Sequence, residues 1–311
     1  MKAVRIHHYG NAEVLQYEDA PVPEIGVDEV LVRVVAASVN PVDWKVREGY
    51  LQQMIPYPFP LTLGWDVSGV VAAVGDAVTD FKPGDAVYSR PDIKRNGTYA
   101  EYVAIRAAEL AHKPRTISHV EAASLPLAVI TAWEVLFTTA QLQAGQRVLI
   151  HAGSGGVGSL AIQLAKSCGA YVITTTSEKN RGFVESLGAD EVIDYQTQAF
   201  HEVVSDVDLV FDTLGGEVQE LSWGVLKSEG ILVSIITPPA QERAASLGVR
   251  CAFVFIEPNA VILQHVAGLV DDGIIRPIVG AEFALQDIAK AHALSESGRA
   301  RGKIVVYVGQ P

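Results

Sequence analysis

Short apolar segments fill the first third of the chain, and glycine or proline residues separate one segment from the next. Each segment has the length of a strand. Strands are expected at Ala3–Ile6, Val30–Ala37, Asp66–Val74, Ala86–Tyr88 and Ala100–Ile105. Short strands at this spacing, divided by turn residues, predict a compact β domain of barrel type.

The pattern changes near His119. A helix is expected over Val120–Thr139, with an interruption at Pro126, and from Arg147 on apolar strands alternate with helical segments. The expected strands are Val148–His151, Val172–Thr176, Glu191–Ile193, Leu209–Asp212 and Ile231–Ile236. The expected helices between them include Gly158–Cys168, Arg181–Leu187 and Val218–Leu226. Continuous apolar strands that alternate with helices indicate a doubly wound parallel sheet, covered on both faces.

Two further helices, Val261–Asp271 and Leu285–Ser297, precede a terminal strand at Lys303–Val308 that is expected to return to the β domain. The predicted fold class is therefore α/β, with two domains. Residues 1–120 and 276–311 form the β-barrel-type domain, and residues 121–275 form the parallel-sheet domain.

A glycine turn follows the first strand of the parallel sheet. Gly153, Gly155 and Gly158 have the spacing G-x-G-x-x-G, and Gly156 and Val157 lie inside the motif. A strand precedes the turn and an amphipathic helix follows it, which is the context that a dinucleotide site requires. We expect the pyrophosphate to bind at the amino end of this helix.

The end of the second strand predicts which dinucleotide binds. An NAD site has an acidic residue there for the ribose 2′-hydroxyl, whereas this chain has Thr175, Thr176 and Ser177, followed by Lys179 and Arg181. Hydroxyls and cations suit a 2′-phosphate, so the prediction is NADPH. Glu178 is the one residue against it, and we expect it to face solvent.

Composition narrows the class of protein. The 311 residues are 49% hydrophobic and carry a net charge of −12, which disfavours nucleic acid and an anionic membrane as partners. The most apolar stretch, 122–137, is broken by Pro126 and Glu134, and the first ten residues lack a signal-peptide core. Two cysteines, Cys168 and Cys251, suit a reducing compartment. We expect a cytoplasmic protein.

Segments from one end of the chain to the other resemble one known family. They are AASVNPVDWKVREG, LGWDVSGVVAAVG, FKPGDAVY, GTYAEYV, AASLPLAVITAW, HAGSGGVGSLAIQLAK, LGADEVIDY, FDTLGG and GKIVVYV. They resemble the medium-chain dehydrogenase/reductase superfamily, in its zinc-free quinone and enone oxidoreductase branch. The resemblance implies a GroES-like β domain interrupted by a Rossmann nucleotide-binding domain, with the active site in the cleft between them. It also implies a homodimer joined through the nucleotide domains. Cys251–Phe255 is either the strand at the dimer edge or one more core strand.

The resemblance also locates the positions that hold catalytic zinc in the alcohol dehydrogenases of this superfamily. Here these positions are Asn40, Trp65 and Leu127, and none of the three side chains is a zinc ligand. Asp66 stands where the zinc enzymes have a glutamate beside a ligand, and one carboxylate does not make a metal site. We therefore expect no metal.

The family's cofactor contacts carry over to several positions of this sequence. Asn40, Val42 and Asp43 would lie near the nicotinamide and its ribose, although Asn40 and Asp43 also suit a turn at a strand end. Thr131 would lie near the nicotinamide phosphate, and the glycine turn would meet the pyrophosphate. The 2′-phosphate would be surrounded by Ser177, Lys179 and Tyr195, and Lys303 would close the adenosine end.

Without zinc, the implied chemistry is hydride transfer from NADPH to a quinone, an alkenal or another α,β-unsaturated carbonyl. Asn40 is a catalytic candidate. The aromatic residues Trp44, Tyr50, Trp65 and Tyr99 are candidates to line the acceptor site, or else they pack in the core. Tyr50 lies one position earlier than the tyrosine acid of related enoyl-thioester reductases, so either Tyr50 or water supplies the proton. Two alternatives remain open, an enoyl-thioester reductase and a non-catalytic NADPH-binding protein.

Overall fold

The structure, a computed structural model, describes residues 1–309. The chain forms two compact units. The first contains Met1–Leu127 and the chain from Glu257 on, and the second contains Ala128–Ile256. The predicted second boundary at 275/276 therefore lies too late, because helix α9 (Ala260–Asp271) belongs to the first unit.

Long-range hydrogen bonds hold α9 in the first unit. The Asp271 carboxylate accepts hydrogen bonds of 2.9 Å from the amide and the hydroxyl of Thr116. The Tyr88 hydroxyl donates to the Leu263 carbonyl at 2.5 Å. All three bonds join residues more than a hundred positions apart. A pattern of local periodicity therefore did not assign the helix to its unit.

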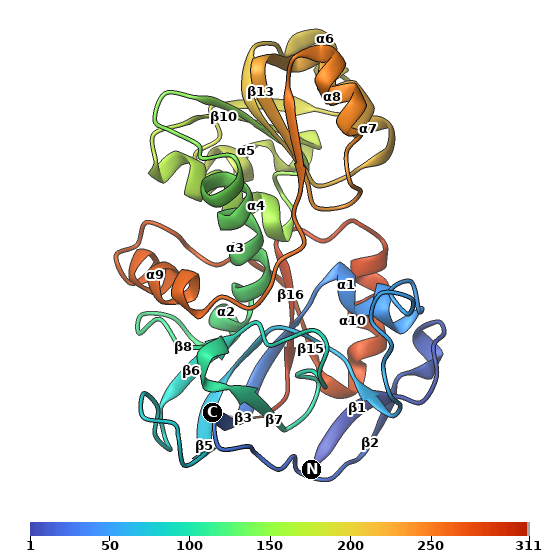
Figure 1. The fold of residues 1–311 in the computed structure, drawn as a ribbon, viewed down its shortest axis with the longest axis vertical. Coiled ribbons are helices and arrows are strands. Elements are labelled where there is room, and N and C mark those ends of the chain that lie inside the picture. Colours follow the sequence, from blue (N-terminus) through green and yellow to red (C-terminus); the bar gives the residue numbers. More distant parts are fainter. Residues whose placement is uncertain (310–311) are drawn as a thin grey trace. The chain divides into compact units, whose positions relative to one another are not determined.

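The first unit is built on two sheets (Figure 1). The larger sheet has the order β15-β16-β3-β5-β6-β8, and β7 pairs with β3. Its strands are β3 (Glu29–Val39), β5 (Val67–Val74), β6 (Ala86–Ser89), β7 (Tyr102–Arg106), β8 (Leu110–His112), β15 (Val279–Ala284) and β16 (Lys303–Tyr307). The smaller sheet contains β1 (Lys2–Ile6), β2 (Gln16–Asp19) and β4 (Leu61–Thr62). The terminal strand β16 pairs antiparallel with β3, as predicted.

Strand β3 is buried on both sides. Val30, Val32 and Val34 project into one apolar cluster, and Ala37 and Val39 belong to a second. This follows from the period of two in a strand, because residues of opposite parity face opposite sides of the sheet. The strand ends in polar residues that are also buried, and they begin the candidate site described below.

Four helices accompany the sheets of the first unit. They are α1 (Pro41–Arg47), α2 (His119–Ala123), α9 and α10 (Ile288–Glu296). Arg47 of α1 is completely buried and joins α1 to α10, since its Nη1 donates to Glu296 at 2.7 Å and contacts His292 at 3.2 Å.

The second unit contains a fully parallel sheet of order β11-β10-β9-β12-β13-β14. Its strands are β9 (Arg147–Ile150), β10 (Tyr171–Thr176), β11 (Glu191–Asp194), β12 (Val207–Asp212), β13 (Leu226–Ser234) and β14 (Arg250–Phe253). The main helices are α3 (Pro126–Trp133), which starts in the first unit, α4 (Gly156–Ser167), α5 (Arg181–Glu185), α6 (Phe200–Val203), α7 (Gly216–Ser222) and α8 (Gln241–Leu247). Figure 1 shows α4 and α5 on one side of this sheet and α6, α7 and α8 on the other. The predicted doubly wound sheet is confirmed.

Strand β14 lies at the edge of the parallel sheet, next to β13. Phe253 and Phe255 in this segment are 39% and 45% exposed. The segment predicted as either a dimer edge or a core strand is therefore an edge strand, and its role in a dimer stays a prediction.

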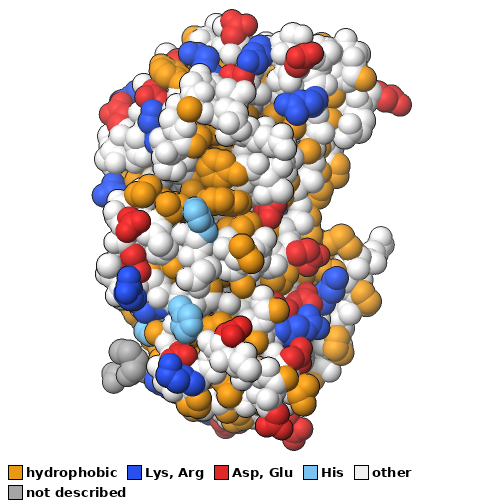
Figure 2. Space-filling model, turned by 60° about the vertical axis from the view of Figure 1, so that its left-hand side comes forward, with side chains coloured by type: hydrophobic (Ala, Val, Ile, Leu, Met, Phe, Trp, Pro, Cys, Tyr) orange, Lys and Arg blue, Asp and Glu red, His pale blue; other side chains and the backbone are white. Residues whose placement is uncertain are grey.

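Charged side chains of both signs are dispersed over the face in Figure 2. The net charge of −12 is thus not gathered into one acidic region on this face. Within residues 1–309, no helix is both long enough and apolar enough to cross a membrane.

Candidate functional site

The glycine turn connects β9 to α4 and is packed too closely for side chains at two positions. A Cβ at Gly153 would lie 2.0 Å from the Thr174 hydroxyl oxygen, and one at Gly158 would lie 2.4 Å from the Ala152 carbonyl oxygen. Gly155 has more room and is the N-cap of α4, where no side chain caps the helix. The first amides of a helix have no partners within it, so this bare, uncapped turn fits a pyrophosphate.

The carboxyl end of β10 lies beside the turn. The Thr176 hydroxyl donates to the Ser154 hydroxyl at 2.9 Å, and the Asn180 amide contacts the hydroxyls of Ser154 and Ser177 at 3.2 and 3.3 Å. The register pairs Thr176 with Asp194, so Ser177 and Tyr195 follow the ends of neighbouring strands. The structure thus places Ser177 and Tyr195 after neighbouring strand ends, and their contact with a 2′-phosphate stays a prediction. It adds Ser154 and Asn180, which sequence reasoning missed.

The charges after β10 separate into a paired and an unpaired set. Glu178 binds the Arg181 guanidinium at 2.9 Å, and Arg181 also donates to the Val192 carbonyl at 3.0 Å. Arg181 is therefore occupied, and the acid that argued against a 2′-phosphate is neutralised. Lys179 is exposed and takes part in none of the ion pairs found within residues 1–309, so its charge is available to a ligand.

A buried polar cluster in the first unit surrounds the Asp66 carboxylate. Oδ2 accepts hydrogen bonds from the Ser38 hydroxyl at 2.7 Å, the Asn40 amide at 2.8 Å and the Lys303 ammonium at 3.1 Å. Oδ1 accepts one from the Leu127 backbone amide at 2.7 Å. Each of the four side chains is at least nine-tenths buried. Ser38 and Asn40 reach the same carboxylate because they are two positions apart at the end of β3.

This cluster contains or adjoins the three positions that the family resemblance matches to the zinc ligands of the zinc enzymes. Asn40 and the Leu127 amide both bind Asp66, while Trp65 is fully buried and donates its indole N–H to the Arg95 carbonyl at 3.3 Å. Amide and indole groups are not zinc ligands. Among residues 1–309, no group of three or more His, Cys, Asp or Glu side chains is arranged to hold a metal ion.

Lys303 binds Asn40 in this structure, and its predicted place at the adenosine end is therefore in conflict with the prediction that Asn40 lies at the nicotinamide. Its ammonium binds the Asn40 side-chain oxygen, the Val39 carbonyl at 3.2 Å and Asp66. If Asn40 lies at the nicotinamide, then Lys303, which contacts Asn40, lies there too. The adenosine is at the other end of the dinucleotide. The physical reason is the buried Asp66 charge, which requires a counter-ion, and Lys303 supplies it.

Asp43 lies in helix α1 and is completely buried. Its Oδ2 accepts hydrogen bonds of 2.7 Å from the Asn40 backbone amide and from the Tyr99 hydroxyl, whereas Oδ1 has no partner. Burial raises the pKa of Asp43 to about 7, because a carboxylate in an apolar environment loses its hydration. The hydrogen bond from the Asn40 backbone amide to the Asp43 carboxylate forms a turn at the end of β3. A turn-forming role was the alternative that the sequence left open for these two residues.

The aromatic candidates for the acceptor site divide into two pairs. Trp65 and Tyr99 are completely buried in the apolar core of the first unit, so they are packing residues in this structure. Trp44 is half-buried and Tyr50 is 67% exposed, with their rings 6.2 Å apart in an edge-to-face contact. Of the two roles that the sequence left open, the burial of Trp65 and Tyr99 favours packing in the core.

Val42 and Thr131 are the two remaining residues that were predicted to contact the cofactor. Val42 is half-buried against the core of the first unit, and Thr131 is 5% exposed in α3.

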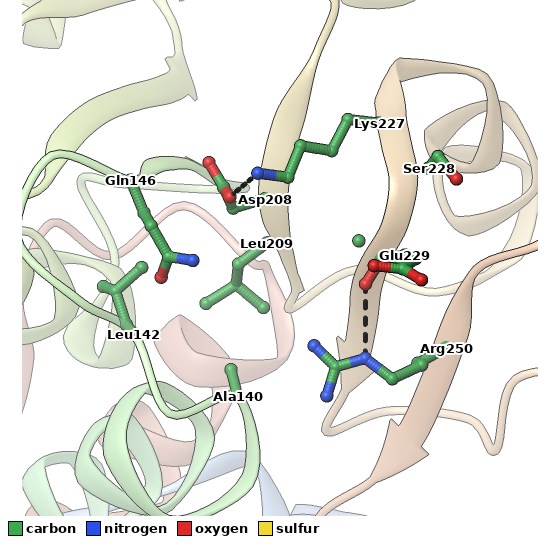
Figure 3. A pocket seen from close by; sticks show the side chains of 10 residues that line it. Ala140, Leu142, Gln146, Asp208, Leu209, Lys227, Ser228, Glu229 and Arg250 are labelled. Carbon is green, nitrogen blue, oxygen red and sulfur yellow. Dashed lines mark hydrogen bonds and ion pairs between the residues drawn. The ribbon is translucent and has the colours of Figure 1, made fainter.

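Figure 3 shows a pocket of about 200 Å³ in the second unit. Its lining comes from the segment 140–146 before β9 and from the amino ends of β12, β13 and β14, whereas the glycine turn follows the carboxyl end of β9. The pocket is therefore at the opposite edge of the sheet from the dinucleotide site. Its cations are already engaged, Lys227 with Asp208 and Arg250 with the Glu229 carbonyl.

The Asp43→Asn variant tests the raised pKa of Asp43. An asparagine oxygen can keep both hydrogen bonds, and its amide replaces the unpartnered Oδ1. The folded pKa is above the unfolded value of 3.8. The stability that protonation contributes is therefore complete below pH 3.8 and lost as the pH rises through about 7. We expect the difference in Tm, variant minus wild type, to increase by about 4 °C between pH 5 and pH 8. Thermal unfolding over this range measures it, and a constant difference would contradict the assignment.

Comparisons with known proteins agree with this geometry. Residues 26–115 match the family model of the alcohol dehydrogenase GroES-like domain, and residues 187–306 match that of the zinc-binding dehydrogenase. The NADPH-dependent alkenal/one oxidoreductase of Arabidopsis thaliana chloroplasts is 39% identical over 99% of this chain and 79% of its own length.

Two solved structures have the same fold over the whole chain. The quinone oxidoreductase of Coxiella burnetii has a TM-score of 0.94 at 37% identity, and 99% of each chain is covered. The quinone oxidoreductase of Escherichia coli, solved in complex with NADPH, has a TM-score of 0.90 at 26% identity, covering 99% of this chain and 100% of that one. The chain belongs to the medium-chain dehydrogenase/reductase superfamily, in the branch of the quinone and alkenal/one oxidoreductases.

Proposed function

We propose that this chain is an NADPH-dependent oxidoreductase that reduces quinones or α,β-unsaturated carbonyl compounds without a metal ion. The observation that carries the proposal is the Asp66 cluster. Where the zinc enzymes of the superfamily hold a metal, this chain has a carboxylate that is bound by an ammonium and by two amides. The quinone and alkenal/one oxidoreductases among its relatives support the choice of acceptor.

NADPH supplies a hydride when bound, and the chain's own residues bind and orient it. The helix α4 amides at Gly156 and Val157, beside the bare Gly155, would hold the pyrophosphate, with Gly153 and Gly158 giving the close packing. Ser177, Lys179 and Tyr195 would surround the 2′-phosphate, and Thr131 would lie near the nicotinamide phosphate.

Asn40, Val42 and Asp43 would lie at the nicotinamide and its ribose. Lys303 binds the oxygen of the Asn40 amide and Asp66 accepts from its nitrogen, so the orientation of this amide is fixed. A fixed polar group costs little reorganisation when the reactants bind. We therefore assign Asn40 a positioning role at the reacting end of the cofactor.

The reduction of an enone also requires a proton. We propose Tyr50 as its donor, because the ring is 67% exposed in the turn after α1 and its hydroxyl is accessible. A hydrogen bond to Glu48 raises the pKa of Tyr50, so the phenol keeps its proton until a basic carbon is formed.

Assembly and location are inferred from single features. We propose a homodimer joined along the edge strand β14, which ends at the exposed Phe253 and is followed by the exposed Phe255. Sedimentation equilibrium that gives the mass of one chain would refute it.

We also propose that the protein works in the cytoplasm, since Cys168 and Cys251 are both free thiols.

A panel of acceptors tests the proposed activity. We expect NADPH to be oxidised rapidly with 1,4-naphthoquinone, phenanthrenequinone or a 2-alkenal, and more slowly with crotonyl thioester. The absorbance of NADPH at steady state measures each rate. Preference for the thioester would favour an enoyl-thioester reductase. Tight binding of NADPH with no oxidation by any acceptor would favour a non-catalytic NADPH-binding protein.

The Lys179→Ala variant tests the 2′-phosphate site. A charge-assisted hydrogen bond to phosphate is the strong kind, and Lys179 is exposed, so we expect the Kd for NADPH to rise about tenfold. The Kd for NADH is expected to stay unchanged, because NADH has no 2′-phosphate. Fluorescence titration measures both constants. Lys227→Ala removes the same charge at the other edge of the sheet and serves as the control; an equal effect there would contradict the assignment.

The Tyr50→Phe variant separates proton donation from hydride transfer. We expect kcat with a 2-alkenal to fall at least about tenfold, since general acid catalysis contributes this much or more. Reduction of a quinone is expected to be unaffected, because the reduced oxygens take protons from water. Full activity with the 2-alkenal would remove Tyr50 from the mechanism and leave water as the donor.

A further inference from the structure

Arg90 is a buried cation without a hydrogen-bond partner. It follows strand β6 in the first unit, and only 2% of its surface is exposed. Its Nε and Nη1 are enclosed, and neither has a hydrogen-bond partner; Arg90 also takes part in none of the ion pairs found within residues 1–309. Arginine cannot shed its proton in a protein, so at least three N–H donors of a permanent charge are left unsatisfied.

Arg47 shows what a buried structural arginine looks like in the same unit. It is fully buried, yet its guanidinium donates to the Gly10 carbonyl at 3.1 Å and to the carboxylates of Glu48 and Glu296, both at 2.7 Å. Buried charges in proteins are normally paired and hydrogen-bonded in this way. Arg90 departs from the rule that Arg47 follows.

The carboxylates whose charges act on Arg90 either have other partners or are exposed. Burial lowers the pKa of Arg90, and the charges of Asp66, Glu257, Asp92 and Glu109 oppose this effect. Asp66 already accepts four hydrogen bonds. Asp92 and Glu109 both bind Arg106, and Glu257 is exposed. The negative charges of these carboxylates favour a cation at this position, but they accept no hydrogen bond from the Arg90 guanidinium.

The missing partner has a defined chemistry. A guanidinium presents its donors in one plane and matches planar oxygen acceptors, such as a carbonyl or a carboxylate. Ser89 of β6 pairs antiparallel with Val67 of β5, so Arg90 and Asp66 are the next residues on the two neighbouring strands. Asp66 in turn binds Asn40, the residue assigned to the nicotinamide. The ligand is therefore expected at the reacting end of the cofactor.

We propose that the Arg90 guanidinium binds the carbonyl oxygen of the acceptor and stabilises the negative charge that develops on it. This inference rests on the proposed function. As the hydride forms a new C–H bond at the β-carbon of an enone, the C=C π electrons shift toward the carbonyl and its oxygen becomes anionic. NADPH is oxidised to NADP⁺, and a proton then adds to the α-carbon. The zinc enzymes have a metal ion to polarise such an oxygen, and here fixed hydrogen-bond donors do so.

Replacement of Arg90 tests the proposal through activity and through stability. We expect Arg90→Met to lower kcat/KM for a 2-alkenal or a quinone about 10²-fold, which is the effect of losing one donor to an oxyanion. The Kd for NADPH should stay within about twofold, and Arg90→Lys should recover part of the activity. The Tm of Arg90→Met should be equal to or above that of the wild type, because no partner is left unpaired. Arg47→Met is the matched control, and its Tm should fall, because it strips Glu48 and Glu296 of their partner.

A binding measurement does not depend on turnover. 4-Nitrophenolate carries an anionic oxygen on a planar ring, and its absorbance reports binding to the protein with NADP⁺ present. We expect Arg90→Met to weaken this binding at least about tenfold. If the wild type binds 4-nitrophenolate through Arg90 but oxidises NADPH with no acceptor, the anion site stands and the proposed function fails.

Three results would overturn the inference. The first is a fall in the Tm of Arg90→Met as large as that of Arg47→Met, which would make Arg90 a structural residue. The second is a loss of NADPH affinity with kcat/KM for the acceptor unchanged at saturating NADPH, which would assign the guanidinium to a cofactor phosphate. The third is equal binding of 4-nitrophenolate by the wild type and by Arg90→Met.

Discussion

The buried carboxylate of Asp66 is the constraint on which the candidate site of the first unit depends. It accepts four hydrogen bonds, and its donors come from the end of β3, from β16 and from the start of α3. A carboxylate removed from water requires such compensation. Lys303 provides the opposite charge, so the pairing of the terminal strand β16 with β3 is needed for the site as well as for the sheet.

The same ion pair limits the chemistry that the site can perform. A zinc ion can coordinate a substrate oxygen directly, whereas an ammonium that already binds Asp66, Asn40 and the Val39 carbonyl has its three donors in use. Lys303 therefore fixes Asn40 and leaves polarisation of the substrate to other groups. Acceptors that take a hydride at carbon and delocalise the charge onto oxygen have the least need of a metal.

The sequence predicted what local patterns determine, and it failed where distant residues decide. The parallel sheet and the glycine turn were predicted because apolar runs and spaced glycines are local signals. The assignment of α9 depends on contacts of Asp271 and Leu263 with residues far away in the chain. Ser154, as one more small residue in a glycine turn, gave a weak signal. Arg90 gave none, because only its burial and its missing partners distinguish it from a surface arginine.

Arg90 and Asp43 are both buried with a polar atom that has no partner, and the difference between them is informative. Asp43 can bind a proton, and its pKa of about 7 shows that neutralisation is within reach at neutral pH. Arg90 has no such route, because the guanidinium stays charged at any pH at which the protein is folded. In the proposal made above, an oxygen of the acceptor completes its hydrogen bonds. Departures from the packing rules of a consistent fold tend to mark functional sites, and of these two residues Arg90 is the one for which we propose a ligand.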